Sequence, residues 1–195
     1  GSNSQVDANI SFNVSDRYFF GITMGAYSID YSRESYYEEL GVDGNYYDFS
    51  NWYETTGEGF DVKFGFICRP VQSSPFRFGI SVHTPTWYDM EDVNGSVLYY
   101  NNEFVVEKIA DPFRYSYRTP WKFGLSLGHT IGNYIALGAE YNYSDVSTAK
   151  YSSSDWNNDA YFRNVNEITK NTLKAQHTFK LGMEVKPSDE LSVRV

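Results

Sequence analysis

WKFGLSLG at residues 121–128 and IALGAEYNYS at residues 135–144 are the stretches that decide the fold. In both, apolar or aromatic residues alternate one by one with glycine, polar or small residues. Such alternation places the two kinds of side chain on opposite faces of a β-strand. On one face, the first stretch carries Trp121, Phe123, Leu125 and Leu127, and the second carries Ile135, Leu137, Ala139, Tyr141 and Tyr143.

The same period of two recurs along the rest of the chain, and no segment of similar length has a helical period. We therefore predict an all-β protein with about eight strands in this chain. Further alternating rows lie within residues 8–14, 20–26, 60–68, 76–82 and 173–186, and the run 113–128 is predicted as one 16-residue strand.

The connections alternate between short and long. Short polar turns are predicted at 15–16, 70–74, 130–133 and 187–189, whereas long polar, Tyr-rich loops are predicted near 33–54, 91–111 and 148–171. Short turns at one end and long loops at the other are typical of bacterial outer-membrane barrels. The sequence thus predicts an antiparallel up-and-down meander, part of a transmembrane β-barrel, with residues 1–195 as a single barrel domain in the bacterial outer membrane.

Composition supports this class and excludes others. The 195 residues carry 16 Lys and Arg against 25 Asp and Glu, a net charge of −9, which argues against a nucleic-acid partner. No run approaches the ~20 apolar residues of a membrane-spanning helix. The 14 Phe, 4 Trp and 18 Tyr are numerous enough to form the aromatic girdles that flank the apolar band of a barrel.

No chemistry-bearing constellation emerges from the sequence. The single cysteine and three histidines indicate neither a disulfide nor a metal site, and no nucleophile stands in a catalytic motif. We therefore expect no metal, no cofactor and no enzymatic activity. The alternating run 191–195 stops without a turn residue, which suggests a fragment of a longer barrel.

Two stretches resemble a known family. YRTPWKFGLSL at 117–127 and NYIALGAEYNY at 133–143 are similar to barrel strands of the FadL/TodX outer-membrane transporters, and the diffuse similarity extends over residues 57–195. The resemblance implies passive transport of hydrophobic compounds such as long-chain fatty acids. The N-terminal hatch of that family, with its Asn-Pro-Ala signature, has no counterpart here, so no ligand-binding residue is transferred.

The polar face of each strand is expected to line the barrel interior. Three of its cations, four residues apart, are predicted to form one basic stripe: Arg114, Arg118 and Lys122. Such cations could attract an anionic headgroup. They could instead pair with Asp61, Glu140 and Glu184 across strands, which is the preferred interpretation because the polar groups of a lumen need partners. The lumen-facing basic candidates are Lys63, Arg77, Arg114, Arg118, Lys122, Lys174 and Lys180.

Two Thr-Pro pairs interrupt the predicted strands at Pro85 and Pro120. Because proline cannot donate to a sheet ladder, each should mark a kink, a bulge or the end of pairing. Simple termination of the strand is the preferred interpretation. The alternative is a lateral gap in the wall that would admit an apolar ligand.

The function expected from the sequence is transport of a hydrophobic small molecule through the outer membrane. The expected partners are that ligand and membrane lipid or lipopolysaccharide. A second hypothesis is a structural or adhesive barrel that acts through its long loops. A third is a soluble lipocalin-like binder, whose apolar rows would face inward.

Overall fold

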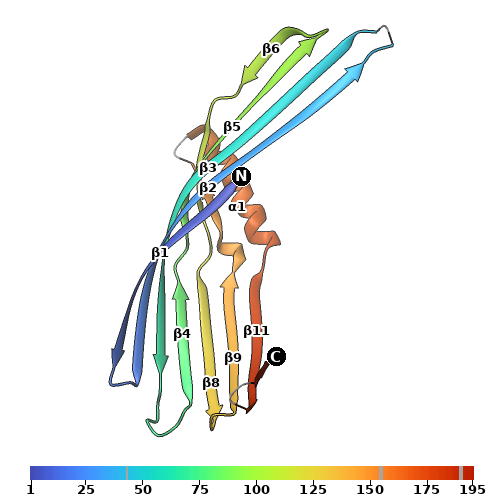
Figure 1. Cartoon of the computed structure of the whole chain (residues 1–195). Helices are drawn as coiled ribbons and strands as arrows, with labels where there is room; N and C mark the ends of the chain where they lie inside the picture. Colours follow the sequence, from blue (N-terminus) through green and yellow to red (C-terminus); the bar gives the residue numbers. More distant parts are fainter. Residues whose placement is uncertain (43, 154–155, 189–190) are drawn as a thin grey trace.

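A computed structural model describes residues 1–42, 44–153, 156–188 and 191–195. Within these ranges, twelve strands, one α-helix and one 3₁₀ turn follow one another (Figure 1). The elements are β1 (Ser2–Val14), β2 (Tyr18–Leu40), β3 (Tyr46–Cys68), β4 (Arg77–His83), β5 (Trp87–Tyr100), β6 (Glu103–Ile109), β7 (Phe113–Arg118), β8 (Lys122–Ile131), β9 (Ile135–Asp145), η1 (Val146–Thr148), β10 (Lys150–Ser152), α1 (Trp156–Thr172), β11 (Ala175–Ser188) and β12 (Leu191–Arg194).

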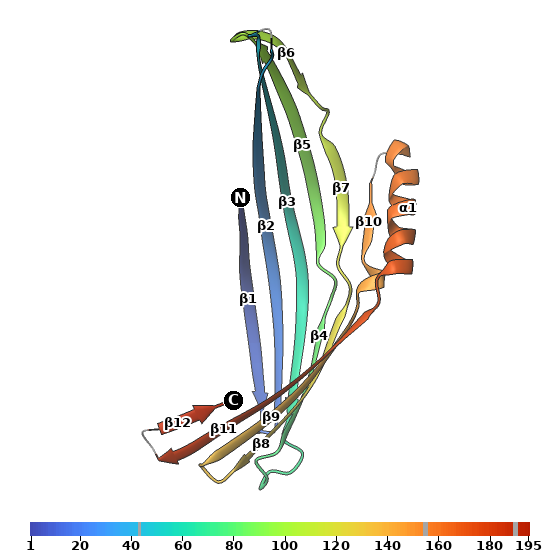
Figure 2. The same ribbon diagram turned by 90° about the vertical axis from the view of Figure 1, so that its right-hand side faces the viewer.

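All twelve strands belong to one antiparallel sheet, which confirms the predicted fold class. The sheet follows the chain as a meander: β4 continues upward as β5, and β8 continues upward as β7 (Figure 2). Joined in this way, the wall strands number about eight, as the alternation predicts. Two of these eight wall strands are interrupted, one between β4 and β5 and the other between β7 and β8. The short strands β6 and β10 are additional. In the described part of the chain, β1 pairs only with β2, and β12 only with β11.

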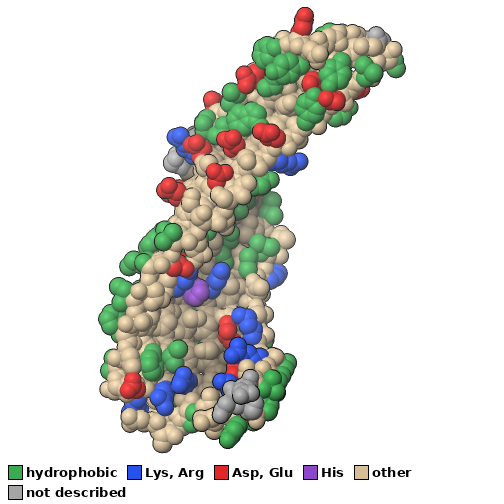
Figure 3. Space-filling model, viewed as in Figure 1, with side chains coloured by type: hydrophobic (Ala, Val, Ile, Leu, Met, Phe, Trp, Pro, Cys, Tyr) green, Lys and Arg blue, Asp and Glu red, His purple; other side chains and the backbone are tan. Residues whose placement is uncertain are grey.

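The strand register separates two faces of the sheet. One residue row joins Thr23, Lys63, His83, Lys122 and Ser144 across five strands. Residues directly opposite each other in a ladder project to the same side, so these side chains share one face, which we call the inner face. The lower part of the sheet curls around it, and Figure 3 shows a tan surface there with cationic and acidic groups around it and hydrophobic groups, in green, mostly along the margins.

The opposite, outer face carries the apolar rows, and their side chains are exposed. Phe179 is 76% exposed and Leu181 86%, and Phe123, Leu125 and Leu137 are also exposed. None of the large side chains in the described ranges is completely buried. The sheet therefore has no conventional hydrophobic core. No helix within these ranges is long and apolar enough to cross a membrane.

The three segments predicted as long loops contain regular structure instead. Residues 33–40 and 46–54 extend β2 and β3, residues 91–109 form most of β5 and all of β6, and residues 148–171 include β10 and most of α1. Hydrogen bonding between neighbouring long hairpins stabilises these polar strands, which lack the alternation used to recognise strands. The run 113–128 is also two strands, β7 and β8, rather than one.

Candidate functional site: the inner face at the waist

A buried carboxylate organises the inner face where the lower sheet meets its upper extension. Asp61 on β3 is only 4% exposed, and its Oδ2 accepts hydrogen bonds from Tyr27 Oη (2.8 Å) and Thr86 Oγ1 (3.1 Å). Its Oδ1 has no hydrogen-bond partner and lies 3.8 Å from Lys63 Nζ. A Cβ at position 25 would lie 2.6 Å from this oxygen, so Gly25 makes room for the carboxylate. We call this level of the sheet the waist.

Both Thr-Pro pairs lie at the waist, side by side. β4 ends at His83 and β5 begins at Trp87, while β7 ends at Arg118 and β8 begins at Lys122. At the interruptions, threonine hydroxyls accept hydrogen bonds from backbone N–H groups in place of the missing ladder bonds. Val62 N donates to Thr84 Oγ1 (3.0 Å), and Thr86 N donates to Thr119 Oγ1 (2.7 Å). Thr119 N also donates to Thr86 O (3.1 Å). Because these bonds join the flanking segments, the two interruptions do not form an open slit.

Each Thr-Pro pair also inserts one residue into its strand. From His83 to Tyr88 the chain advances five residues, whereas the partner strand β3 advances four, from Lys63 to Gly59. An extra residue of this kind is a β-bulge, and it exchanges the faces to which odd and even positions point. The same count separates Lys122 from Tyr117. In these two strands, odd-numbered and even-numbered side chains therefore point to opposite faces above and below the waist.

The predicted stripe of Arg114, Arg118 and Lys122 is split by this bulge. Arg118 pairs in register with Trp87, in the row of Phe60 and Ala26, and so lies on the outer face. Arg114 is on the same face, where its guanidinium forms an ion pair with Glu91. Lys122 alone of the three projects from the inner face. The expectation that Arg114 and Arg118 line the interior is therefore wrong.

The other predicted cations fall into paired and unpaired groups. Lys63 lies 3.4 Å from Asp7 as well as near Asp61, and Lys180 lies 3.2 Å from Glu140. Arg77 begins β4 opposite Gly128, and Lys174 lies in the link between α1 and β11. Among the described residues, Arg77, Lys174 and Lys122 have no ion-pair partner.

Above the waist, a belt of neighbouring tyrosine rings lies on the inner face. The ring centroids of Tyr27 and Tyr88 are 5.8 Å apart, those of Tyr88 and Tyr117 6.3 Å, and those of Tyr117 and Tyr151 4.6 Å. Gly59 lies in register between Tyr27 and Tyr88, and a Cβ there would lie 2.4 Å from the Tyr88 ring. Glycine at this position is therefore what allows these two rings to meet. Sequence reasoning missed the belt because its members come from four different strands.

Helix α1 packs beside the end of this belt. Phe162 is 4% exposed and lies 5.8 Å from Phe113, 6.1 Å from Tyr115 and 6.2 Å from Tyr151, measured between ring centroids. Asn166 adds two 2.8 Å hydrogen bonds, from Tyr151 N to its Oδ1 and from its Nδ2 to Tyr151 O. Phe162 and Asn166 thus join the helix to the sheet through ring contacts and backbone hydrogen bonds.

Replacing Phe162 with alanine is expected to undock α1 while leaving the sheet intact. Removal of a buried phenylalanine typically costs about 3–5 kcal/mol. The measurement is amide hydrogen exchange, which should accelerate in α1 and not in β8 or β9. Ile168→Ala, at a position 56% exposed, is the matched control. Unchanged exchange of α1 in Phe162→Ala would contradict this account of its docking.

The docking of α1 should weaken at high pH. Burial, reinforced by Asp92, Tyr53 and Tyr151, raises the pKa of Tyr115 from 10.0 to about 12. Since the folded state holds this proton more tightly than the unfolded state, the stabilisation is complete below pH 10 and declines as pH rises toward 12. Tyrosinate absorbance should show a late-titrating tyrosine that Tyr115→Phe removes. A titration unaltered by that substitution would contradict the assignment.

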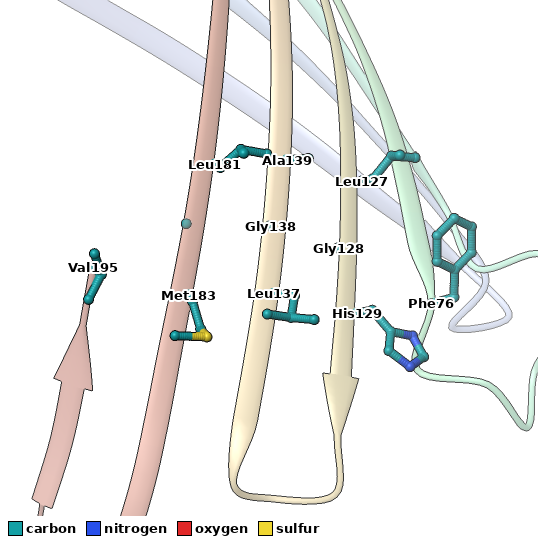
Figure 4. A pocket seen from close by; sticks show the side chains of 11 residues that line it. Phe76, Leu127, Gly128, His129, Leu137, Gly138, Ala139, Leu181, Met183 and Val195 are labelled. Atoms are coloured by element: carbon teal, nitrogen blue, oxygen red, sulfur yellow. The ribbon is translucent and has the colours of Figure 1, made fainter.

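A hollow of about 480 Å³ lies low on the sheet among the apolar side chains (Figure 4). Two rows of side chains border it, Leu127–Ala139–Leu181 and His129–Leu137–Met183, with Gly128 and Gly138 between them. These rows belong to the outer face. This hollow is therefore separate from the inner face and its polar groups.

No group of three His, Cys, Asp or Glu within the described ranges is arranged to hold a metal ion. No protein-family model matches the chain, and no curated protein matches it significantly. Among solved structures, the crystal structure of Acinetobacter baumannii CarO is similar over 93% of this chain and 94% of that chain, at 12% identity and a TM-score of 0.29.

Proposed function

We propose that this chain forms wall strands of a β-barrel in the bacterial outer membrane, and that the barrel passes hydrophobic compounds such as long-chain fatty acids by diffusion. The observation that carries the proposal is the division of the sheet into an exposed apolar outer face and a polar inner face. Soluble proteins rarely expose apolar patches of this extent, whereas outer-membrane barrels present them to lipid.

The outer apolar rows end at the same level on three neighbouring strands. Ala26, Phe60 and Trp87 form one row, and two residues further up the outer row becomes Ser28, Glu58 and Asp89. Below the boundary, β2 needs nine residues, from Tyr18 to Ala26, to cross the band. Membrane-crossing strands need ~9–11 residues. Trp87 is exposed at the boundary, as expected of an interfacial anchor.

The upper strands then extend beyond this boundary as a polar, Tyr-rich wall. Burial is shallow there as well, and acidic residues are frequent (Figure 3). Hydrogen bonds from Tyr36 and Tyr46 lower the pKa of Glu38 on β2, so this carboxylate stays charged on the extension. A polar wall above the lipid is what the barrel needs outside the membrane.

The inner face offers room for a passing solute. A hollow of about 460 Å³ lies over the middle of the lower sheet, and its lining includes the small residues Gly21, Gly65, Ser81 and Gly124 beside larger side chains such as Phe19 and Ile67. A Cβ at position 21 or 65 would meet nothing within 4 Å. Above it, the tyrosine belt provides apolar ring surface. These features support passage of a compound with both polar and apolar parts, without any catalytic step.

The alternatives require different geometry. A lipocalin-like binder would hold its apolar rows inside a closed core, whereas here they are exposed on the outer face. An adhesive barrel would act through the upper extension and would not need the small-residue hollow. We favour transport because the inner hollow is a feature that adhesion leaves unused.

The proposal is tested by expression in a Gram-negative host that lacks its own fatty-acid uptake barrel. Uptake of radiolabelled oleate should rise several-fold when the protein is present, and a deletion of the tip of the β2–β3 hairpin should leave that rise largely in place. Protein that is folded in the outer membrane but leaves oleate uptake at background would refute transport. Uptake that disappears with the hairpin tip would favour a role centred on the extension.

A further inference from the structure

We infer that the inner face holds a binding site for a carboxylate, formed by His83 and Lys122 just below the waist. The inference rests on the proposed transport function and names the chemical group that would be recognised. It starts from a cavity of about 270 Å³ at the junction of β4, β8, β9 and β11. The polar side chains of the inner face that line this cavity are Ser81, His83, Lys122, Asn142, Ser144, Gln176 and Thr178.

The two basic side chains are direct cross-strand neighbours. His83 on β4 and Lys122 on β8 are register partners, and residues so paired have Cα atoms about 4.5–5.5 Å apart. Ser144 and Gln176 continue the same row on β9 and β11. One cation and one imidazole therefore meet in a single hollow, with hydroxyl and amide groups around them.

Among the residues that the structure describes, no acidic side chain lines this cavity. The neighbouring cations differ in this respect, since Lys63 is paired with Asp7 and Asp61, and Lys180 with Glu140. The carboxylate of Glu140, which also accepts a hydrogen bond from Asn142, is already occupied by Lys180. In the described part of the chain Lys122 has no ion-pair partner. An unpaired cation among neutral hydrogen-bond donors is the composition of an anion site.

The charge of the site selects the kind of anion. Lys122 supplies one full positive charge, and the imidazole of His83 supplies a ring N–H donor. This balances a monoanion such as a carboxylate better than a phosphate dianion. The small-residue hollow below and the tyrosine belt above leave space for the apolar remainder of such a molecule on either side of the waist.

The three histidines provide an internal control for detecting the ligand. His83 projects from the inner face, whereas His129 and His177 belong to outer rows, the first beside Leu137 and the second beside Tyr143. Histidine ring resonances of the protein in nanodiscs of neutral phospholipid can therefore be followed during addition of hexanoate, with hexanol as the uncharged counterpart. We expect His83 to shift saturably with hexanoate, and neither outer histidine to shift.

Variants then test the lysine. Lys122→Gln should weaken hexanoate binding about tenfold, because a charge-assisted hydrogen bond is lost, and Lys122→Arg should largely retain it. Lys180→Gln, which removes an interior cation already paired with Glu140, should leave the affinity unchanged. Unshifted resonances of His129 and His177 report that each variant is folded.

Three results would overturn the site: no response of His83 to hexanoate, an equal response to hexanol, or equal losses in Lys122→Gln and Lys180→Gln. Inorganic phosphate that displaces hexanoate at equal concentration would refute the carboxylate class. Protein that imports oleate while His83 ignores hexanoate would remove this site and leave the proposed function intact. Binding of hexanoate without oleate uptake would leave this site in place and refute the proposed transport function.

Discussion

Leu125→Arg is expected to prevent insertion of the protein into membranes. Leu125 is exposed on the outer face near the middle of the apolar rows, in register with Ile80 on one side and Tyr141 on the other. An arginine facing lipid at the bilayer midplane of a β-barrel costs about 2–4 kcal/mol. Folding into phospholipid vesicles, followed by a urea titration, should show the loss.

The matched control places the same side chain on the inner face at nearly the same depth. Gly65 lies in the row adjacent to that of Leu125, and a Cβ there meets nothing within 4 Å, so Gly65→Arg can project into the hollow. We expect Gly65→Arg to insert nearly as well as the parent protein. Normal insertion of Leu125→Arg, or equal failure of both variants, would show that the assignment of the two faces is wrong.

Asp61→Ala should be the most destabilising single change at the waist. It leaves the hydroxyls of Tyr27 and Thr86 without an acceptor and removes one of the two carboxylates beside Lys63. Loss of partners for buried polar groups of this kind costs about 2–4 kcal/mol in total. The midpoint of urea unfolding in detergent micelles should fall accordingly.

Two further substitutions separate burial from charge. Asp7→Ala removes a carboxylate whose side chain is 40% exposed, and it should change the midpoint little, although it contacts the same lysine. Asp61→Asn keeps an acceptor for the two hydroxyls and should fall between the parent and Asp61→Ala. If Asp7→Ala proves as damaging as Asp61→Ala, the ion pairs rather than the buried hydrogen bonds stabilise the waist.

Sequence periodicity predicts the lower part of the sheet well and the upper part poorly. Below the waist, each strand has one apolar and one polar face. The two-residue period of the sequence therefore assigns Phe123, Leu137 and Leu181 to the correct rows. Above it, both faces are polar or aromatic, and the pattern that distinguishes a strand from a loop disappears. The long hairpins there are stabilised by backbone hydrogen bonds between strands, which the periodicity of a single segment does not reveal.

Three features of the candidate site lie beyond such counting for separate reasons. The one-residue insertions at Pro85 and Pro120 reverse the alternation, and proline alone indicates an interruption without its length. Helix α1 has mostly polar residues, and among its described side chains only Phe162 is deeply buried, so its 3.6-residue period is faint. His83 and Lys122 become neighbours only through the register of β4 with β8.

The placement of the two interruptions has a mechanical consequence. β1, β2 and β3 cross the waist as an unbroken three-stranded ribbon, whereas the strands on the other side of β3 are divided there at Pro85 and Pro120. The sheet is therefore stiffer at this ribbon than at the interrupted strands. A tilt of the upper extension relative to the lower sheet would pivot on the ribbon. Such a tilt would strain the threonine bridges first and change the spacing of the wall directly above the His83–Lys122 cavity.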